Sequence, residues 1–109
     1  MAPRVSRGEI WLYTFDSPDK RRPVLVLSRQ KAISLLHSVL VAPITSSAHG
    51  APSEVQVGTA EGLKNDSVVN LDQVQTVAQK RLHHFVGTVG REKMRAVCRA
   101  LMIATACED

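Results

Sequence analysis

Two clusters of polar residues lie beside apolar runs of the sequence, in positions from which they could act on a phosphate group. Arg22 comes directly before the apolar run 24–27, and Pro23 restricts the backbone of Arg22 to extended geometry. A guanidinium on a stiff backbone presents forked donors that match phosphate oxygens, which a lysine cannot do. On composition alone, however, the basic cluster 20–22 is more typical of a solvated turn at the start of a strand.

The second cluster consists of three consecutive hydroxyl residues, Thr45, Ser46 and Ser47, after an apolar run that ends at Ile44. Hydroxyls in this position can donate to a phosphate or hold a reacting group. They more commonly cap turns and satisfy backbone groups. The sequence has no P-loop, no GxGxxG and no Ser-His-Asp or Cys-His arrangement in a recognisable context, so nucleotide enzymes and hydrolases of those classes are excluded.

The histidines and cysteines offer further chemistry. His83 and His84 are candidates for acid–base work because imidazole titrates near neutral pH. They precede a late strand, a place more typical of an exposed turn, and we do not assign them to the site. No CxxC or HxxxH spacing occurs, so we expect no metal and no cofactor. About 13 Å of helical rise separates Cys98 from Cys107, which predicts two free thiols.

The elements that must position these residues are mostly strands. Short runs rich in Val, Ile and Leu predict strands at 9–15, 23–28, 38–44, 54–57, 67–71, 73–77 and 85–89. An apolar i, i+3, i+4, i+7 pattern starting at Met94 predicts one C-terminal helix that covers a face of the sheet. Residues 29–36 fit either a short helix or an irregular crossover. The 109 residues therefore predict a single α+β domain in which a small sheet curls into a barrel.

Two of the predicted strands are apolar on both faces. The runs 24–27 and 39–42 do not alternate between apolar and polar residues, which indicates that both faces are buried. The C-terminal helix covers one face, so a second copy of the chain is expected to cover the other. The alternative is that the curvature of the barrel itself buries both faces of its central strands.

The positive charge is concentrated at the start of the chain. Fourteen Lys and Arg against ten Asp and Glu give a net charge of +4. The first 31 residues hold seven basic and three acidic side chains, so the whole excess lies there. This region would attract a polyanion, although such an excess is also common on surfaces that bind nothing. Aromatic residues make up only 4%, which argues against a platform of stacked aromatics.

The first twenty residues lack the apolar core of a signal peptide and no run reaches transmembrane length, so we expect a reducing cytoplasm and no membrane contact.

Taken in order, five segments resemble the MazF/PemK family of toxins. They are RGEIW at 7–11, RPVLVLS at 22–28, VAPITS at 41–46, SVVNLDQV at 67–74, and Gly87 followed by Met94, Val97, Ala100 and Leu101. The match extends from about residue 7 to about residue 104. Each segment is a weak signal alone, but five in the same order and spacing make a specific one.

The resemblance implies an SH3-like β-barrel with a C-terminal helix, also similar to CcdB, that forms a homodimer. It further implies a metal-independent endoribonuclease that cuts single-stranded RNA through the 2′-hydroxyl, leaving a 2′,3′-cyclic phosphate and a 5′-hydroxyl. A cognate antitoxin, expected to carry an acidic segment, would block it. Arg22 and Thr45 match the catalytic arginine and threonine of the family, and Lys20, Arg21, Ser28, Ser46 and Ser47 are expected to contact substrate.

One departure from the family pattern concerns the loop before Arg22. Only residues 16–21 connect Phe15 to Arg22, where relatives often have a longer loop with an acidic residue, and Asp19 is a weak replacement. The recognised RNA sequence therefore cannot be transferred from relatives. Two other functions stay open: a toxin of the same fold that inhibits a topoisomerase, as CcdB-like toxins do, and an RNA-binding or antitoxin-sequestering module without activity.

Overall fold

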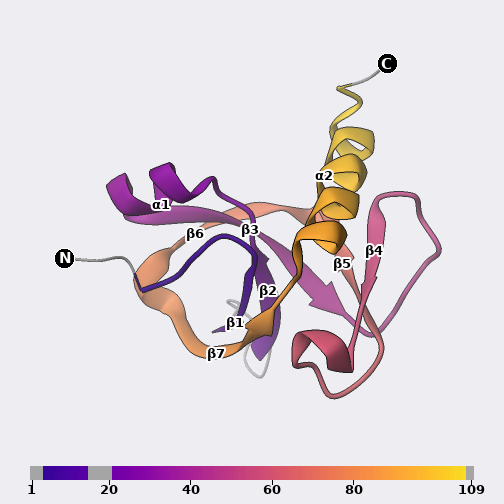
Figure 1. Ribbon diagram of the computed structural model, residues 1–109, viewed down its shortest axis with the longest axis horizontal. Coiled ribbons are helices and arrows are strands. Elements are labelled where there is room, and N and C mark those ends of the chain that lie inside the picture. Colours follow the sequence, from indigo (N-terminus) through magenta and orange to yellow (C-terminus); the bar gives the residue numbers. More distant parts are fainter. Residues whose placement is uncertain (1–3, 15–20, 108–109) are drawn as a thin grey trace.

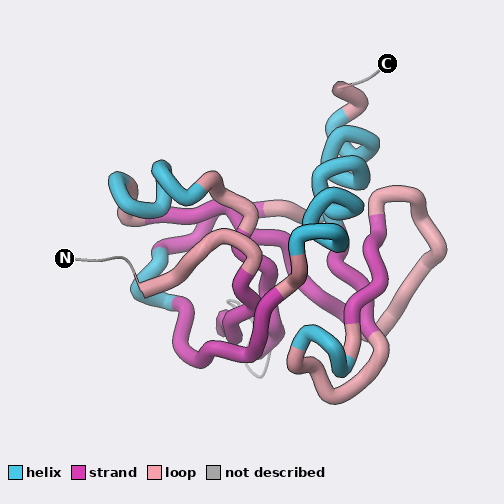
Figure 2. Tube along the Cα trace, viewed as in Figure 1, coloured by secondary structure: helices cyan, strands magenta, loops and turns pink. Residues whose placement is uncertain are grey.

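The computed structural model describes residues 4–14 and 21–107, and strands make up most of this part of the chain (Figures 1 and 2). The strands are β1 (Glu9–Thr14), β2 (Arg21–Val26), β3 (Ser38–Thr45), β4 (Glu54–Val57), β5 (Ser67–Asn70), β6 (Gln75–Ala78) and β7 (Leu82–Thr88). The α-helices are α1 (Gln30–Leu35) and α2 (Arg91–Thr105), and three 3₁₀ turns are η1 (Thr59–Glu61), η2 (Leu71–Gln73) and η3 (Gln79–Arg81). All seven expected strands are present, and the α+β class is confirmed.

Strand β3 is the centre of an antiparallel sheet. It pairs with β2 along one edge, and with β6 and then β5 along the other. The strand order β4-β5-β3-β2-β1-β7 runs from one end of the sheet to the other, and β6 is attached to β3 beside this path. Among the described strands no pairing joins β7 to β4, so the sheet curls without the hydrogen-bonded closure expected of a barrel.

Each face of the sheet is covered by a hydrophobic core of the chain itself. Side chains alternate along β2, so that Val24 and Val26 face one core while Leu25 and Leu27 face the other. Helix α1 supplies Ile33 to the first core and helix α2 supplies Val97 to the second. Two-sided burial therefore does not require a second copy, but it depends on packing of α1 and α2 of the same chain and not on the curvature of a closed barrel alone.

The two helices lie at different ends of the sheet (Figure 1). Helix α1 occupies the 29–36 region that the sequence left open, and it buries Ala32 and Ile33. Helix α2 buries Val97 and Ala100 and packs against β4 and η2. Neither helix in the described part of the chain has the length and apolar character needed to cross a membrane. Both cysteines are free and exposed, as expected.

Two glycines let η1 press against β7. A Cβ atom at Gly87 would overlap the carbonyl oxygen of Glu61, and one at Gly62 would overlap the carbonyl oxygen of Val86. Gly62 also has a φ of +93°, which favours glycine. This close approach fixes where the chain leaves η1, and the loop that follows becomes a wall of the site.

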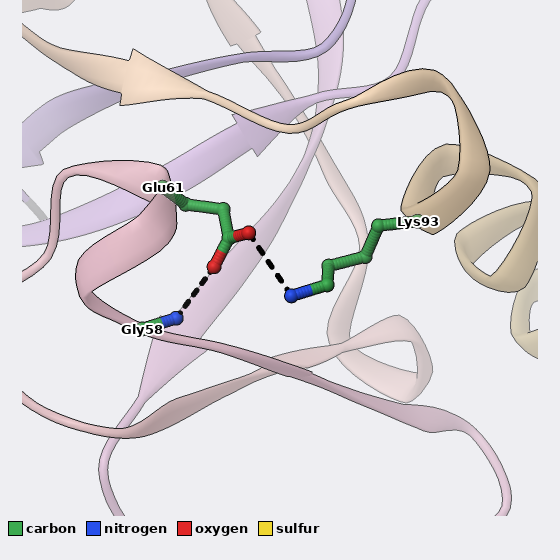
Figure 3. Close-up of polar contacts among 3 residues, drawn as sticks. All are labelled: Gly58, Glu61 and Lys93. Atoms are coloured by element: carbon green, nitrogen blue, oxygen red, sulfur yellow. Dashed lines mark hydrogen bonds and ion pairs between the residues drawn. The ribbon is translucent and has the colours of Figure 1, made fainter.

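The same turn is tied to helix α2 through Glu61, as Figure 3 shows. One carboxylate oxygen accepts the backbone N–H of Gly58 at 2.7 Å, and the other accepts from Lys93 Nζ at 3.0 Å. Burial raises the pKa of Glu61, but the hydrogen bonds from Lys93 and Gly58 and the positive charge of Lys93 outweigh that effect, so its pKa is lowered. The charged side chain of Glu61 therefore links η1 to α2.

Candidate active site

Arg22 and Thr45 lie next to each other at one end of the sheet. Strands β2 and β3 pair with Val24 opposite Pro43 and Leu25 opposite Ala42. The same antiparallel register, continued by two residues, puts Arg22 opposite Thr45. Both residues line a cavity of about 660 Å³. The two segments flagged by the sequence are thus brought together by strand pairing.

The floor of this cavity is apolar and its walls carry polar groups. Leu12, Pro23 and Ile44 form the floor, because each belongs to a neighbouring strand and lines the cavity. The remaining lining comes from the β3–β4 loop, the loop after η1, and strands β5 and β7: Ser46, Ser47, Gly62, Leu63, Lys64, Asn65, Ser67, His84, Phe85 and Val86. The charged residues among these described lining residues are cations, Arg22 and Lys64, which suits an anionic ligand.

A second hollow of about 560 Å³ adjoins the first and shares Arg22, Thr45 and Ser47 with it. Three amide side chains line it, from Asn70, Gln73 and Gln75, together with Pro43 and His49. Amides offer both donors and acceptors and can hydrogen-bond the edge of a nucleobase. Arg22 and Thr45 therefore stand between a hollow with cationic walls and one with amide walls.

The hydroxyl oxygen of Thr45 has a backbone partner in the loop that follows β3. Its Oγ1 accepts the backbone N–H of Ser47 at 3.1 Å, so the hydroxyl proton is directed elsewhere and can be donated to a ligand. Further along the same loop, the Glu54 carboxylate accepts the backbone N–H groups of His49, Gly50 and Ala51 at 2.9–3.2 Å. Because the two contacts fix both halves of the β3–β4 loop, the loop forms a defined wall beside Arg22.

Not every residue expected to contact substrate reaches these hollows. Ser46 and Ser47 line the cavity with Arg22 and Thr45. Arg21 is exposed on β2 opposite Thr14 and is not among the lining residues. The structure does not bring Ser28 to the site either: its Oγ accepts the backbone N–H of Leu40 at 2.8 Å, away from both hollows. Lys20 and Asp19 lie outside the described residues.

Sequence reasoning missed His84 and Lys64. The expectation that His83 and His84 precede the last strand is wrong, because β7 begins at Leu82 and both histidines are exposed within it. His84 lines the cavity, whereas His83 does not. A predicted strand that began at Leu82 would have included His84 as a strand residue. No sequence signal distinguishes Lys64 from other loop lysines.

Comparison with known proteins shows which family the chain belongs to. A model of the family described as PemK-like, MazF-like toxins of type II toxin–antitoxin systems matches residues 6–105. The chain belongs to this family. The probable endoribonuclease MazF5 of Mycobacterium tuberculosis is 40% identical over 103 residues, which cover 94% of each chain.

Solved structures of MazF proteins share the fold. The structure of Mycobacterium tuberculosis toxin MazF-mt6 is 34% identical with a TM-score of 0.83, covering 90% of this chain and 96% of that one. A mycobacterial endoribonuclease in complex with its cognate antitoxin is 22% identical with a TM-score of 0.77, covering 94% of this chain and 93% of that one. The cavity at Arg22 and Thr45 is thus the candidate active site of a MazF-family toxin.

Proposed function

We propose that this chain is a metal-independent toxin endoribonuclease that cuts single-stranded RNA at a short sequence. Cleavage proceeds by attack of the 2′-oxygen on the adjacent phosphorus and leaves a 2′,3′-cyclic phosphate and a 5′-hydroxyl. The observation that supports this proposal is that Arg22 and Thr45 line one cavity, in a chain whose family includes named endoribonucleases.

In this mechanism Arg22 and Thr45 stabilise charge that develops at phosphorus. Attack by the 2′-oxygen places additional negative charge on the non-bridging oxygens, and a fixed guanidinium accommodates it with two parallel hydrogen bonds. The hydroxyl of Thr45, already oriented by the Ser47 N–H, donates to a third position. A guanidinium stays protonated in proteins, so Arg22 serves as a donor and not as the base.

The partners follow from the family and from the charge of the site. A toxin of a type II system is blocked by an antitoxin, and cationic walls fit an acidic antitoxin segment that would occupy the same cavity as RNA. We propose that the toxin acts as a homodimer in the cytoplasm. The large apolar side chains of Leu35, Leu36 and Ile103 are exposed in one chain, which supports burial of α1 or α2 against a partner.

The experiment that tests this function is cleavage of mixed-sequence single-stranded RNA in excess EDTA, with the fragment ends identified by mass spectrometry. We expect discrete cuts that bear cyclic phosphates. Arg22→Ala should lower the cleavage rate by about 10³-fold, because a charge-stabilising donor is lost. Arg29→Ala is the matched control, since Arg29 is an exposed arginine that lines neither hollow at Arg22, and it should cut at the normal rate.

Two results would contradict the proposal. Intact RNA after incubation with folded wild-type protein, on substrates of diverse sequence, would favour inhibition of a protein target such as a topoisomerase. Equal cleavage rates for wild type and Arg22→Ala would show that the cavity at Arg22 does not take part in cleavage. A thermal melt of each variant separates loss of activity from loss of folding.

A further inference from the structure

The proposed cleavage needs a base for the 2′-hydroxyl proton. The described residues discussed so far do not supply one, and Asp19 lies outside the described residues. Arg22 and Lys64 are cations at neutral pH and can only donate. The hydroxyls of Thr45, Ser46 and Ser47 are far weaker bases than an imidazole. Among the described residues that line the cavity there is no carboxylate, and His84 has the one side chain of a type that ordinarily titrates near neutral pH.

Strand pairing puts His84 on the floor of the cavity. His84 pairs with Leu12 between β7 and β1, and Leu12 pairs with Pro23 between β1 and β2. Directly paired residues of antiparallel strands project from the same face, and all three of these line the cavity. The imidazole therefore lies on the face that carries the apolar floor, two strands away from the strand that carries Arg22.

The distance between the strands that carry Arg22 and His84 suits one ribose phosphate. Neighbouring strands are about 4.8 Å apart, so the backbones of β2 and β7 are about 10 Å apart across β1. The side chains of Arg22 and His84 both line this cavity. A phosphate bound by the guanidinium would thus have its own ribose within reach of the imidazole.

The charged groups around His84 leave its imidazole available. Arg22 and Lys64 share its cavity. On β1, Glu9 accepts hydrogen bonds from Trp11 Nε1 and from the backbone N–H of Ser6, and is not a cavity residue. Glu61, the last residue of the neighbouring η1 turn, is bound to Lys93, and Arg81 on η3 lies over the ring of Tyr13. Within the described part of the chain, no side-chain hydrogen bond to His84 competes with substrate.

We propose that His84 is the general base of the cleavage reaction, an assignment that rests on the proposed endoribonuclease function. The neutral imidazole takes the proton of the 2′-hydroxyl as the 2′-oxygen forms its bond to phosphorus. The bond from phosphorus to the 5′-oxygen breaks with its electron pair, and the 5′-oxygen takes a proton from water. The resulting hydroxide removes the proton from the imidazolium, which returns His84 to its starting form.

The adjacent histidines provide a matched pair of variants. We expect His84→Gln to lower the single-turnover cleavage rate by 10²- to 10³-fold, about the usual contribution of a general base. Its affinity for an RNA with a 2′-deoxy residue at the cut site, which binds without reacting, should stay within about threefold, because one exposed side chain adds little to binding. His83→Gln changes the adjacent histidine, which does not line the cavity, and should behave as wild type.

A pH profile and a rescue experiment distinguish catalysis from a structural role. The wild-type rate should depend on pH because a general base acts only in its deprotonated form, and His84→Gln should lose this dependence. Free imidazole added to His84→Ala should restore part of the rate.

The outcomes separate this assignment from the function on which it rests. Activity of His84→Gln equal to that of His83→Gln, or a loss confined to RNA affinity, would overturn the role of His84 while Arg22→Ala still identifies the site. Absence of cleavage by wild type would overturn the endoribonuclease function itself, and this assignment with it.

Discussion

At the scale of single residues, Thr45 uses one oxygen for two purposes. The oxygen accepts the Ser47 N–H at 3.1 Å, and the hydroxyl proton stays available for a phosphate oxygen. We predict that Thr45→Val, which keeps the shape and removes the hydroxyl, lowers kcat by about 10²-fold because a donor to the transition state is lost. Thr45→Ser keeps the hydroxyl and should retain most of the activity. The measurement is steady-state cleavage of a fluorogenic RNA that contains the mapped cut site.

The two variants also test how the hydroxyl acts. A fall in kcat without change in KM would locate its effect in the transition state. Equal losses in Thr45→Val and Thr45→Ser would contradict a hydrogen-bonding role and indicate that the methyl group and backbone position matter more.

The sequence indicates some site residues and conceals others for physical reasons. Arg22 and Thr45 stand out because strand ends place polar groups beside buried runs, and the family resemblance selects them. Ser28 shares the same motif, yet its hydroxyl is occupied by the N–H of Leu40, a pairing that depends on the fold. His84 depends on which face of β7 it occupies, and that is set by pairing with Leu12, a residue more than seventy positions earlier.

At the scale of elements, the ion pair between Glu61 of η1 and Lys93 of α2 predicts a pH dependence of stability. The pKa of Glu61 is lowered in the folded protein, so the folded state prefers the carboxylate. Its contribution is fully present above the ordinary glutamate pKa of about 4.3, and is lost as pH falls through the lower folded value. We predict that Glu61→Gln lowers the free energy of unfolding at pH 7 by about 1–2 kcal/mol, through loss of a charge-assisted hydrogen bond.

Denaturant unfolding of wild type and Glu61→Gln at several pH values between 3 and 7 measures this effect. The difference in free energy of unfolding between the two proteins should be constant near neutral pH. It should decrease towards zero as Glu61 becomes protonated. Lys93→Met, which removes the other partner, should reduce the same pH dependence. A difference that stays constant down to pH 3 would show that Glu61 charge does not support the fold.

The elements themselves were largely predictable, because runs of Val, Ile and Leu between turn residues indicate strands directly. The predicted boundaries of elements were wrong where side chains hydrogen-bond to nearby backbone groups. The strand expected from Gln73 begins instead at Gln75, because Leu71–Gln73 form a 3₁₀ turn in which the side chain of Asn70 accepts the N–H of Asp72. Helix α1 has only six residues and no side-chain cap, so its sequence carries too little periodicity to distinguish it from a crossover.

At the scale of the whole molecule, two of the arginines that make up the charge excess of the first 31 residues are used for structure. Arg4 donates to the carbonyl oxygens of Gln79 and Leu82 and lies over the ring of Trp11. Arg7 donates to the carbonyl of Leu27 and to the sulfur of Cys98. Net charge indicated a polyanion partner, but only the fold distinguishes cations that face the cavity from cations that hold β7 and α2 in place.

This division of charge predicts how salt weakens RNA binding. Each phosphate contact to a single strand contributes about −0.7 to the slope of log affinity against log salt. Arg22 and Lys64 both line the cavity, so Arg22→Gln and Lys64→Gln should each reduce the magnitude of the slope by about 0.7. Arg95→Gln, an exposed change on α2 that is not a cavity residue, should leave it unaltered. Fluorescence anisotropy of an RNA with a 2′-deoxy residue at the cut site, titrated at several salt concentrations, gives each slope without cleavage. Unchanged slopes for Arg22→Gln and Lys64→Gln, with a reduced slope for Arg95→Gln, would place the RNA on the α2 side of the molecule and not in the cavity.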